Sequence, residues 1–369
     1  MSQTIVKSAG TKSGFAVLFD TAIEALMKDA WRISLRDPAQ ALFFLNVVRN
    51  QRRAARLRTE WEKQGLHVPP LLIASITSRC NLRCTGCYSH ALRPKADAEL
   101  DTARLRTVFA EARDLGVSII MLAGGEPLLR PDVLALADEF PGTLFPTFTN
   151  GLLVDDAFTS EFKRRRNLIP VLSLEGPRAT TDARRGEGVF AHLETTIKRL
   201  HGEGIFLGTS LTVTSANVAA LTDRGFIDAL VSAGCRLFFF VEYVPVQPGT
   251  EELSLTASQK AALLLQLETF KRELPGLFVA FPGDEEEYGG CLAAGRGFVH
   301  LNAEGSIEPC PFAPWSDSTV RTGTLADALR SGFLARISAE HGRLTETRGG
   351  CALWAQREWV ESVLEKPGT

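Results

Sequence analysis

The sequence predicts an α/β protein built on a parallel sheet. Apolar runs rich in β-branched and aromatic residues alternate with helical patterns along most of the chain. Strands that alternate with helices form parallel sheets, because each helix returns the chain to the same end of the sheet. Polar motifs follow the strands, and the carboxyl ends of parallel strands lie along one edge. We therefore expect a functional site on that edge.

The composition limits the classes of protein. The 369 residues are 45% hydrophobic and 23% charged, with a formal net charge of −2, which suits a globular protein of one to three domains. The balanced charge gives no electrostatic reason to expect nucleic acid as a partner. No apolar run reaches the roughly 18 residues of a membrane span. The first 15 residues lack a signal-peptide pattern, so we expect a cytoplasmic protein.

Residues 1–69 predict a helical leader. Within residues 37–58 an Asp-Pro pair begins a helix that is apolar at first and then strongly basic. One interpretation is a helix packed on the rest of the protein with a solvated basic end. The other is peripheral contact with an anionic membrane surface, through apolar insertion and arginine attraction.

Residues 70–275 contain six strand–helix units. The strands are expected at residues 71–77, 118–124, 143–149, 168–175, 205–213 and 236–244. The helices are expected near residues 101–115, 131–140, 155–166, 188–203, 217–233 and 257–273. Six units are too few for a closed eight-stranded barrel, so the sheet forms either an open, partial barrel or a doubly wound sheet.

Three cysteines, Cys80, Cys84 and Cys87, follow the first strand with the spacing C-x3-C-x2-C. The chain has seven cysteines, and an odd number argues against a complete set of disulfides. Three thiolates in one loop can hold a metal centre. Iron–sulfur clusters usually take four thiolates, so three would leave one iron with an open position. A structural zinc site with His90 as fourth ligand is the alternative.

The other strand ends also carry polar motifs. These are "GGEP" (124–127), "TNG" (149–151), "SLEG" (173–176), "TVTSAN" (212–217) and "EYVP" (242–245). Their common edge indicates an active site, because scattered polar residues would not all fall at strand ends. Within the last motif, Tyr243 either faces a substrate or fills the mouth of the barrel.

With these motifs the sequence resembles the radical S-adenosylmethionine (SAM) superfamily, over roughly residues 70–275. The cysteine loop resembles the superfamily's signature. The resemblance implies a partial (β/α)6 TIM-like barrel and a [4Fe–4S] cluster bound by Cys80, Cys84 and Cys87. SAM would be cleaved reductively there to a 5′-deoxyadenosyl radical, which abstracts hydrogen from a substrate carbon.

The resemblance also implies a set of SAM contacts. Glycines and the glutamate of the GGEP motif would hold the amino group of SAM. Arg185 would contact the SAM carboxylate, and the adjacent Arg184 is the alternative. Thr149 and Ser173 would contact the ribose of SAM, and Val213 and its strand would pack on the adenine. The full set is Gly124, Gly125, Glu126, Pro127, Thr149, Ser173, Glu175, Arg185 and Val213.

Two positions depart from the superfamily's pattern. The loop usually has an aromatic residue just before its last cysteine, where this chain has Gly86, followed by Tyr88 after the cysteine. The fourth-strand motif often ends in aspartate, where this chain has Glu175. We therefore expect another residue to make the aromatic contact beside the cluster. The longer carboxylate of Glu175 could reach the ribose of SAM or the substrate.

Residues 276–369 predict a small α+β domain with a hairpin at 298–310 and a helix near 324–338. Cys291, Gly305 and Cys310 resemble the opening half of a SPASM domain, and the dense second half is absent. The remainder resembles the shorter twitch form, which implies an auxiliary [4Fe–4S] cluster held by Cys291, Cys310 and Cys351 without a fourth cysteine. The alternative is that these are buried, unliganded thiols.

Three further features are expected to be structural. Cys235 enters an apolar strand and is predicted to pack, although it is the one spare thiol for an auxiliary cluster. His300 lies in a hairpin strand and is predicted to pack. The acidic run at 284–287 is predicted to be a solvated loop.

The sequence therefore predicts a radical SAM enzyme that modifies a peptide or a small metabolite. The auxiliary cluster would assist oxidation or bind substrate, and reduced ferredoxin or flavodoxin would donate electrons. One alternative is a lipid- or isoprenoid-modifying enzyme at the membrane surface. Another is a non-catalytic binding protein that is stabilised by metal.

Overall fold

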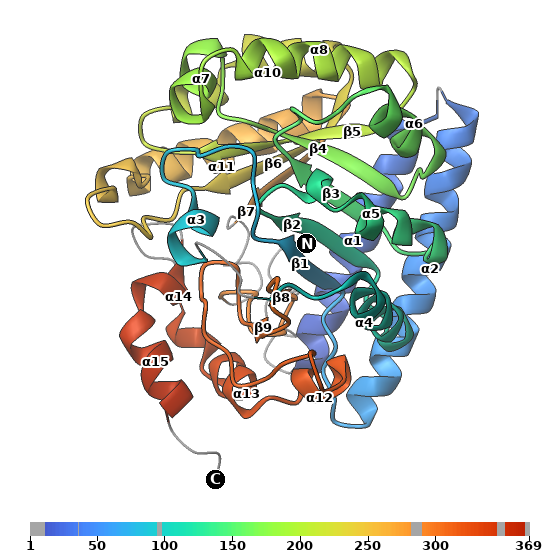
Figure 1. Ribbon diagram of the computed structural model, residues 1–369, viewed down its shortest axis with the longest axis vertical. Coiled ribbons are helices and arrows are strands. Elements are labelled where there is room, and N and C mark those ends of the chain that lie inside the picture. The colour runs from blue at the N-terminus through green and yellow to red at the C-terminus, as the bar shows by residue number, and fades with distance from the viewer. Residues whose placement is uncertain (1–11, 36, 94–97, 282–289, 345–350, 366–369) are drawn as a thin grey trace.

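The computed structural model describes residues 12–35, 37–93, 98–281, 290–344 and 351–365. The acidic run at 284–287 lies outside the described residues. Among the described residues, nine strands form one sheet in the order β7-β6-β5-β4-β3-β2-β1-β8-β9 (Figure 1). The strands are β1 (Leu71–Thr77), β2 (Ile119–Gly124), β3 (Phe145–Thr149), β4 (Leu168–Leu174), β5 (Leu207–Val213), β6 (Cys235–Glu242), β7 (Leu277–Phe281), β8 (Phe298–Leu301) and β9 (Ile307–Glu308).

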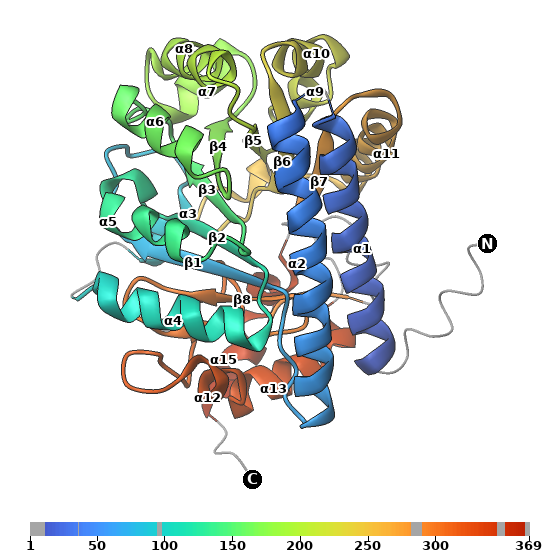
Figure 2. The same ribbon diagram turned by 90° about the vertical axis from the view of Figure 1, so that its right-hand side faces the viewer.

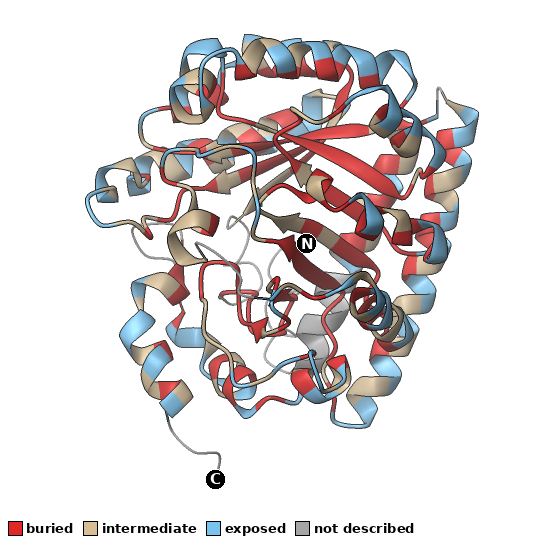
Figure 3. Ribbon diagram, viewed as in Figure 1, coloured by how far each residue is buried: buried red, intermediate tan, exposed pale blue. Residues whose placement is uncertain are grey.

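The parallel sheet predicted from the sequence is confirmed. Neighbouring strands from β7 to β8 all pair in parallel, and β9 alone pairs antiparallel, with β8. The sheet is an open, partial barrel, because its edge strands β7 and β9 are not paired with each other. The strands are buried on nearly every residue, as expected for a parallel sheet that helices cover on one face and a packed interior covers on the other (Figure 3).

Helices follow the strands close to their predicted positions. The barrel helices are α3 (Tyr88–Leu92), α4 (Thr102–Leu115), α5 (Pro131–Leu134), α6 (Asp156–Arg164), α7 (Arg178–Arg185), α8 (Val189–Gly202), α9 (Val218–Leu221), α10 (Arg224–Ser232) and α11 (Ala257–Glu273). Several begin at an Asp or Thr whose side chain accepts a hydrogen bond from a first-turn N–H, as at Asp101, Asp155 and Thr256. These caps explain why the boundaries could be predicted.

Two strand placements were not predicted. β7 follows α11 and pairs in parallel with β6, so the strand–helix order continues one strand beyond residue 275. The hairpin strand β8 pairs in parallel with β1, with Ile73 opposite His300, and thereby extends the sheet. The smaller C-terminal elements α12 (Leu325–Leu329), α13 (Gly332–Ala339), α14 (Ala352–Ala355) and α15 (Arg357–Glu365) lie beside this edge (Figure 1). The division of the chain at residues 69 and 275 stays a prediction.

The N-terminal helices α1 (Lys12–Ile33) and α2 (Pro38–Lys63) lie side by side across the outside of the sheet (Figure 2). Phe44 of α2 is 1% exposed and packs edge-on against Phe206, with ring centroids 4.9 Å apart. Farther along, the buried Arg58 donates to the carbonyl of Gly116. The apolar side of α2 is thus packed against protein. No helix among the described residues is long and apolar enough to cross a membrane.

Candidate active site

A cavity of about 220 Å³ opens where the parallel strands end. Side chains from β1 to β7, from the cysteine loop and from the segment after β9 line it. Its charged and polar lining comes mainly from the predicted motifs. Its apolar lining includes Ile73, Met121, Phe148, Phe239 and Phe281. The expected edge therefore holds a site with a polar part and an aromatic-rich part.

The three loop cysteines all line this cavity. Cys80 Sγ accepts from the backbone N–H of Leu82 at 3.4 Å and from the Asn150 amide at 3.9 Å. The Arg185 guanidinium lies 4.0 Å from Cys84 Sγ. Burial raises the pKa of both thiols, and the Leu82 N–H opposes that shift at Cys80. Donors therefore already point at the sulfurs, as they do where thiolates bind metal.

Glu126 is the third residue of the Gly-Gly-Glu-Pro turn, and its carboxylate is held by neighbouring residues. Thr149 Oγ1 donates to it at 2.7 Å, and the backbone N–H groups of Asn150 and Leu128 donate at 2.8 and 3.0 Å. Burial raises the pKa of Glu126, while these hydrogen bonds and the Arg185 charge favour the ionised form. The side chain is 1% exposed yet lines the cavity, so it is fixed in place for a cationic ligand.

The cysteine loop and the GGEP turn are bound directly to each other. Gly125 N donates to Thr77 O at 2.7 Å, and Glu126 N donates to Arg79 O at 2.8 Å. A Cβ at Gly125 would lie 2.0 Å from Arg79 O, so only glycine permits this approach. The residue before Cys80 and the residue before Glu126 are therefore in backbone contact.

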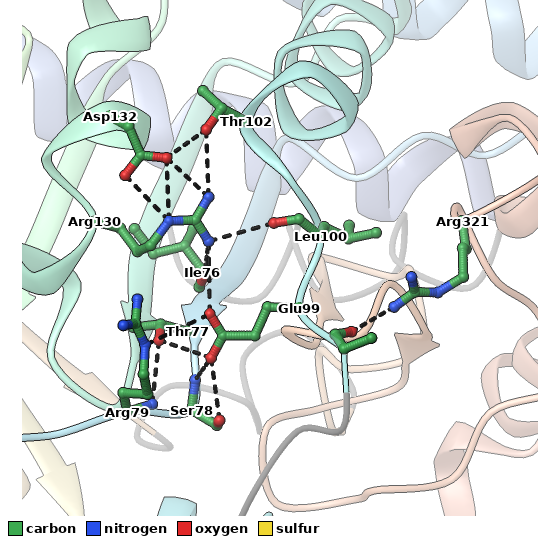
Figure 4. Close-up of polar contacts among 11 residues, drawn as sticks. Ile76, Thr77, Ser78, Arg79, Glu99, Leu100, Thr102, Arg130, Asp132 and Arg321 are labelled. Atoms are coloured by element: carbon green, nitrogen blue, oxygen red, sulfur yellow. Dashed lines mark hydrogen bonds and ion pairs between the residues drawn. The ribbon is translucent and has the colours of Figure 1, made fainter.

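A buried ion-pair network supports the same two loops (Figure 4). Glu99 accepts from Thr77 Oγ1 at 2.8 Å and from Ser78 N at 2.9 Å, just before the first cysteine. Arg130, which follows the GGEP turn, lies 3.6 Å from Glu99 and donates to Ile76 O at 3.1 Å. From a residue that follows the GGEP turn, the network thus holds the backbone that leads into the cysteine loop.

Two arginines from α7 converge on Glu175. Arg184 Nη1 and Arg185 Nη2 each lie 2.6 Å from Glu175 Oε1. The other carboxylate oxygen, Oε2, has no hydrogen-bond partner among the described residues. Both guanidiniums line the cavity, whereas Glu175 stands behind them and is 1% exposed. The longer carboxylate thus orients the two rival arginines, and it does not itself line the cavity.

The remaining predicted SAM contacts divide by position. Those on the cavity wall are Gly124, Gly125, Glu126, Ser173 and Arg185. Pro127, Thr149 and Val213 are buried and are not part of the wall. Thr149 reaches Glu126, and Val213 is fully buried in β5. The assignment of these residues to SAM stays a prediction.

The C-terminal cysteines are brought together. Burial raises the pKa of the Cys310 thiol well above its usual value, and a hydrogen bond with Cys351 and the nearby Cys291 add to the shift. Cys351 Sγ accepts from Trp354 N at 3.4 Å. Residues 311 and 312, directly after Cys310, line the cavity. The second thiol group therefore adjoins the first site.

The residues predicted to pack do so. Cys235 is the first residue of β6, is fully buried, and has a pKa that burial raises to about 12. It lies at the amino end of its strand, whereas the site lies at the carboxyl ends. His300 is fully buried between Ser75 and Glu308, each at 2.8 Å.

Sequence reasoning missed several contacts at the site. Asn150 belongs to the quoted "TNG" motif, but nothing in the sequence assigned it to Cys80. Glu99 and Arg130 lie outside every quoted motif. The helix α7, which presents both arginines, was not predicted. A capping search would also have missed α7, because its N-cap is a proline without a side-chain bond.

The residues present fit a [4Fe–4S] cluster with SAM beside it. Three thiols line one cavity, two of them, Cys80 and Cys84, receive N–H donors, and a fixed carboxylate and two arginines face the same cavity. Among the described residues no three His, Cys, Asp or Glu side chains converge closely enough to hold a single metal ion. The thiolates of a four-iron cluster each bind a different iron and stay farther apart.

Comparisons with known proteins agree with this arrangement. The sequence pattern of the radical SAM superfamily matches residues 74–218. A Fe-coproporphyrin III synthase of Methanosarcina barkeri is 30% identical over 213 residues, which are 55% of this chain and 52% of that protein. The mycofactocin maturase MftC of Mycobacterium ulcerans is 28% identical over 324 residues, covering 80% and 86%. The chain thus spans about half the length of the first relative and most of the second.

Solved structures share the fold. SuiB of Streptococcus suis bound to its precursor peptide SuiA superposes with a TM-score of 0.62 and 17% identity, covering 83% of this chain and 74% of that one. The structure of anSMEcpe with bound AdoMet gives a TM-score of 0.58 and 19% identity, covering 75% and 83%. These identities are low, so the likeness concerns the fold alone. The cysteine loop and the GGEP turn both lie within residues 74–218, the segment that matches the radical SAM superfamily.

Proposed function

We propose that this chain is a radical SAM enzyme that modifies a peptide or a small metabolite. The observation that carries the proposal is the convergence of the three-cysteine loop and the GGEP turn on one cavity. Cys80, Cys84 and Cys87 would hold a [4Fe–4S] cluster through three of its irons. When bound, this cluster and SAM supply one-electron cleavage of SAM and a carbon radical that removes hydrogen from the substrate.

The chain's own residues bind and orient SAM. The Glu126 carboxylate receives the SAM ammonium group, and Thr149 keeps that carboxylate in place through its 2.7 Å hydrogen bond. Arg185 or Arg184 receives the SAM carboxylate, with Glu175 fixing their direction. Ser173 lies on the cavity wall and offers its hydroxyl to the ribose. The apolar part of the lining keeps water away from the reacting carbon.

The auxiliary cluster is part of the proposal. Cys291, Cys310 and Cys351 are its ligands, and their close approach supports this assignment. With three thiolates, a fourth iron position is left for substrate, water or another side chain. The cluster would either accept an electron during an oxidation or bind substrate. Reduced ferredoxin or flavodoxin would supply electrons to the chain.

The substrate class rests on two kinds of support. Relatives include one named for a peptide, a PqqA peptide cyclase, and others named for small molecules, a Fe-coproporphyrin III synthase and a pre-heme d1 synthase. The aromatic part of the lining, with Phe148 and Phe239 at 5.1 Å, suits an apolar side chain or ring at the point of attack. A polar substrate would leave its hydrogen bonds unmade there.

No observation favours the membrane-surface alternative. Most of the apolar face of α2, including Phe44, packs inside the protein, and Leu42 is its one large hydrophobic residue described as exposed, which leaves little apolar area for insertion. Flotation of the full chain with vesicles of phosphatidylcholine and phosphatidylglycerol tests it. We expect the protein to stay in the lower fractions at physiological salt. Salt-resistant flotation would return the lipid-modifying alternative to first place.

Iron analysis tests the proposal directly. The wild-type chain, the triple variant C80A/C84A/C87A and the triple variant C291A/C310A/C351A are reconstituted anaerobically. We expect about eight iron atoms per wild-type chain and about four in each variant, because four irons belong to each cluster. The first variant should also lose reductive formation of 5′-deoxyadenosine.

Each contrary result has its own meaning. If C80A/C84A/C87A keeps all of its iron, the SAM-cluster assignment is wrong. If it binds none, the C-terminal cysteines hold no independent cluster. If the iron-loaded wild-type chain forms no 5′-deoxyadenosine from SAM under a strong reductant, the non-catalytic alternative replaces the enzyme.

A further inference from the structure

The cysteine loop has no side chain of its own at the position before its last cysteine. Gly86 occupies the position just before Cys87, and its φ of +68° lies in the left-handed region that favours glycine. A Cβ at Gly86 would lie 2.7 Å from Tyr243 Oη, 3.0 Å from Tyr243 Cε2 and 3.2 Å from Tyr243 Cζ. The space that a side chain at this position would enter is therefore already filled by the ring of Tyr243, from the far side of the barrel mouth.

Tyr88, the other aromatic residue beside the loop, has a different contact. Its ring packs edge-on against Phe312, with centroids 4.8 Å apart. Phe312 belongs to the segment that follows Cys310. Tyr88 thus joins the loop to the C-terminal segment, while Tyr243 covers Gly86.

Tyr243 is held between the cysteine loop and the end of strand β5. It directly follows β6, and its backbone N–H donates to Val213 O at 2.9 Å. Val213 ends β5, and the resemblance to the superfamily implies an adenine contact there. Tyr243 therefore joins the end of β5, through its backbone, to the loop that carries Cys84 and Cys87, through its ring. Tyr243, Cys84 and Cys87 all line the cavity.

The hydroxyl of Tyr243 is buried without a partner. The residue is 3% exposed, and Oη has no hydrogen-bond partner among the described residues. Buried hydroxyls are nearly always hydrogen-bonded, so a lone one on a cavity wall indicates a ligand that supplies the missing bond. Its position beside Cys84 and Cys87 places that ligand next to the SAM-binding loop.

We infer that Tyr243 hydrogen-bonds through its hydroxyl to the adenosyl group of bound SAM and thereby positions it against the loop at Gly86. The inference rests on the proposed function, because it requires SAM in this cavity. In this inference Tyr243, from the end of β6, supplies the aromatic side chain that the cysteine loop lacks at Gly86. Tyr243 acts by positioning and exchanges no electron or proton.

The test compares two variants that each remove a buried hydroxyl without a partner. Y243F removes the one on the cavity wall. T209V removes the hydroxyl of Thr209, which is fully buried in β5, also lacks a partner among the residues that the structure describes, and does not line the cavity. Each reconstituted protein is dialysed to equilibrium against labelled SAM in the absence of substrate, and iron content is measured on the same samples.

We expect Y243F to bind SAM roughly three- to ten-fold more weakly, as for loss of one hydrogen bond, and T209V to bind within about twofold of wild type. S-adenosylhomocysteine, which shares the adenosyl group, should lose affinity for Y243F by the same factor. An unchanged SAM affinity in Y243F overturns the inference, and so does a loss for SAM without a loss for S-adenosylhomocysteine.

The melting temperatures of the cluster-free wild type and Y243F show whether the Tyr243 hydroxyl positions SAM or stabilises the fold. Since Tyr243 Oη has no partner within the described part of the chain, Y243F should melt at the same temperature as wild type or slightly higher. A clearly lower melting temperature would mean that the hydroxyl stabilises the fold, which contradicts the inference. If wild-type protein with full iron does not bind SAM at all, the proposed function fails instead.

Discussion

At the scale of single residues, glycines decide how closely the two motif loops approach. A Cβ at Gly125 would meet a backbone oxygen, Arg79 O, at 2.0 Å, and no flexible side chain is there to move aside. The same closeness lets Glu126 N donate to Arg79 O. The glycine is therefore required by a contact between two loops, in addition to any contact with SAM.

We predict that Gly125→Ala separates the cysteine loop from the GGEP turn. SAM affinity should fall by at least about tenfold, because a shift of about 1 Å in a site can cost up to 100-fold. Equilibrium dialysis after reconstitution measures it. Gly202→Ala is the matched control, since a Cβ there meets nothing within 4 Å, and it should bind SAM as wild type does. Equal affinities in the two variants would contradict the prediction.

At the scale of elements, the loops after β1 and β2 are joined by side chains that neither loop's motif includes. Glu99 precedes α4 and accepts from the backbone before Cys80. Arg130 follows the GGEP turn, is 8% exposed, and donates to Ile76 O at 3.1 Å and to Leu100 O at 3.3 Å. A planar guanidinium with several fixed donors can satisfy such partners together, which an ammonium group cannot.

We predict that Arg130→Lys lowers the free energy of unfolding by about 2–4 kcal/mol, because buried acceptors lose their donors. Arg106→Lys is the matched control. Its ion pair with Glu139 is at the surface, with side chains 47% and 44% exposed, so it should change stability by less than about 1 kcal/mol. Urea unfolding of the cluster-free proteins measures both. Similar small losses would show that the network does not stabilise the loops.

At the scale of the whole molecule, segments from both ends of the chain complete the barrel. The pair α1 and α2 covers the outside of the sheet (Figure 2), and β8 adds to the β1 edge. Arg93, close after the cysteine loop, donates to Pro311 O at 2.7 Å and pairs with Glu308. The C-terminal segment is therefore tied to the loop that carries the first three cysteines.

We predict that α2 contributes to stability through its buried face. Phe44→Ala should lower the free energy of unfolding by about 3–5 kcal/mol, because the side chain is 1% exposed and leaves a cavity. Leu42→Ala, on the same helix but 59% exposed, should cost less than about 1 kcal/mol. Thermal and urea unfolding measure both losses. A small loss for Phe44→Ala would mean that the helix is only loosely docked.

The elements and motifs that depend on local sequence were predictable. Strand positions follow from runs of apolar β-branched residues, as at residues 71–77, and helix starts follow from caps such as Asp101. The spacing of Cys80, Cys84 and Cys87 and the adjacent glycines at 124–125 are likewise visible within a few residues. The expected common edge follows from strand direction alone.

The tertiary structure alone decided which distant residues meet. Nothing in the sequence pairs Gly86 with Tyr243, Glu99 with Arg130 or β8 with β1, because each contact depends on how the strands are ordered in the sheet. Periodicity reports which face of an element is apolar, but it does not name the neighbour on that face. The sequence by itself thus determined the superfamily and its cysteine ligands as predictions. The shape of the cavity, the partner of Glu175 and the lone hydroxyl of Tyr243 came from packing between segments far apart in the chain.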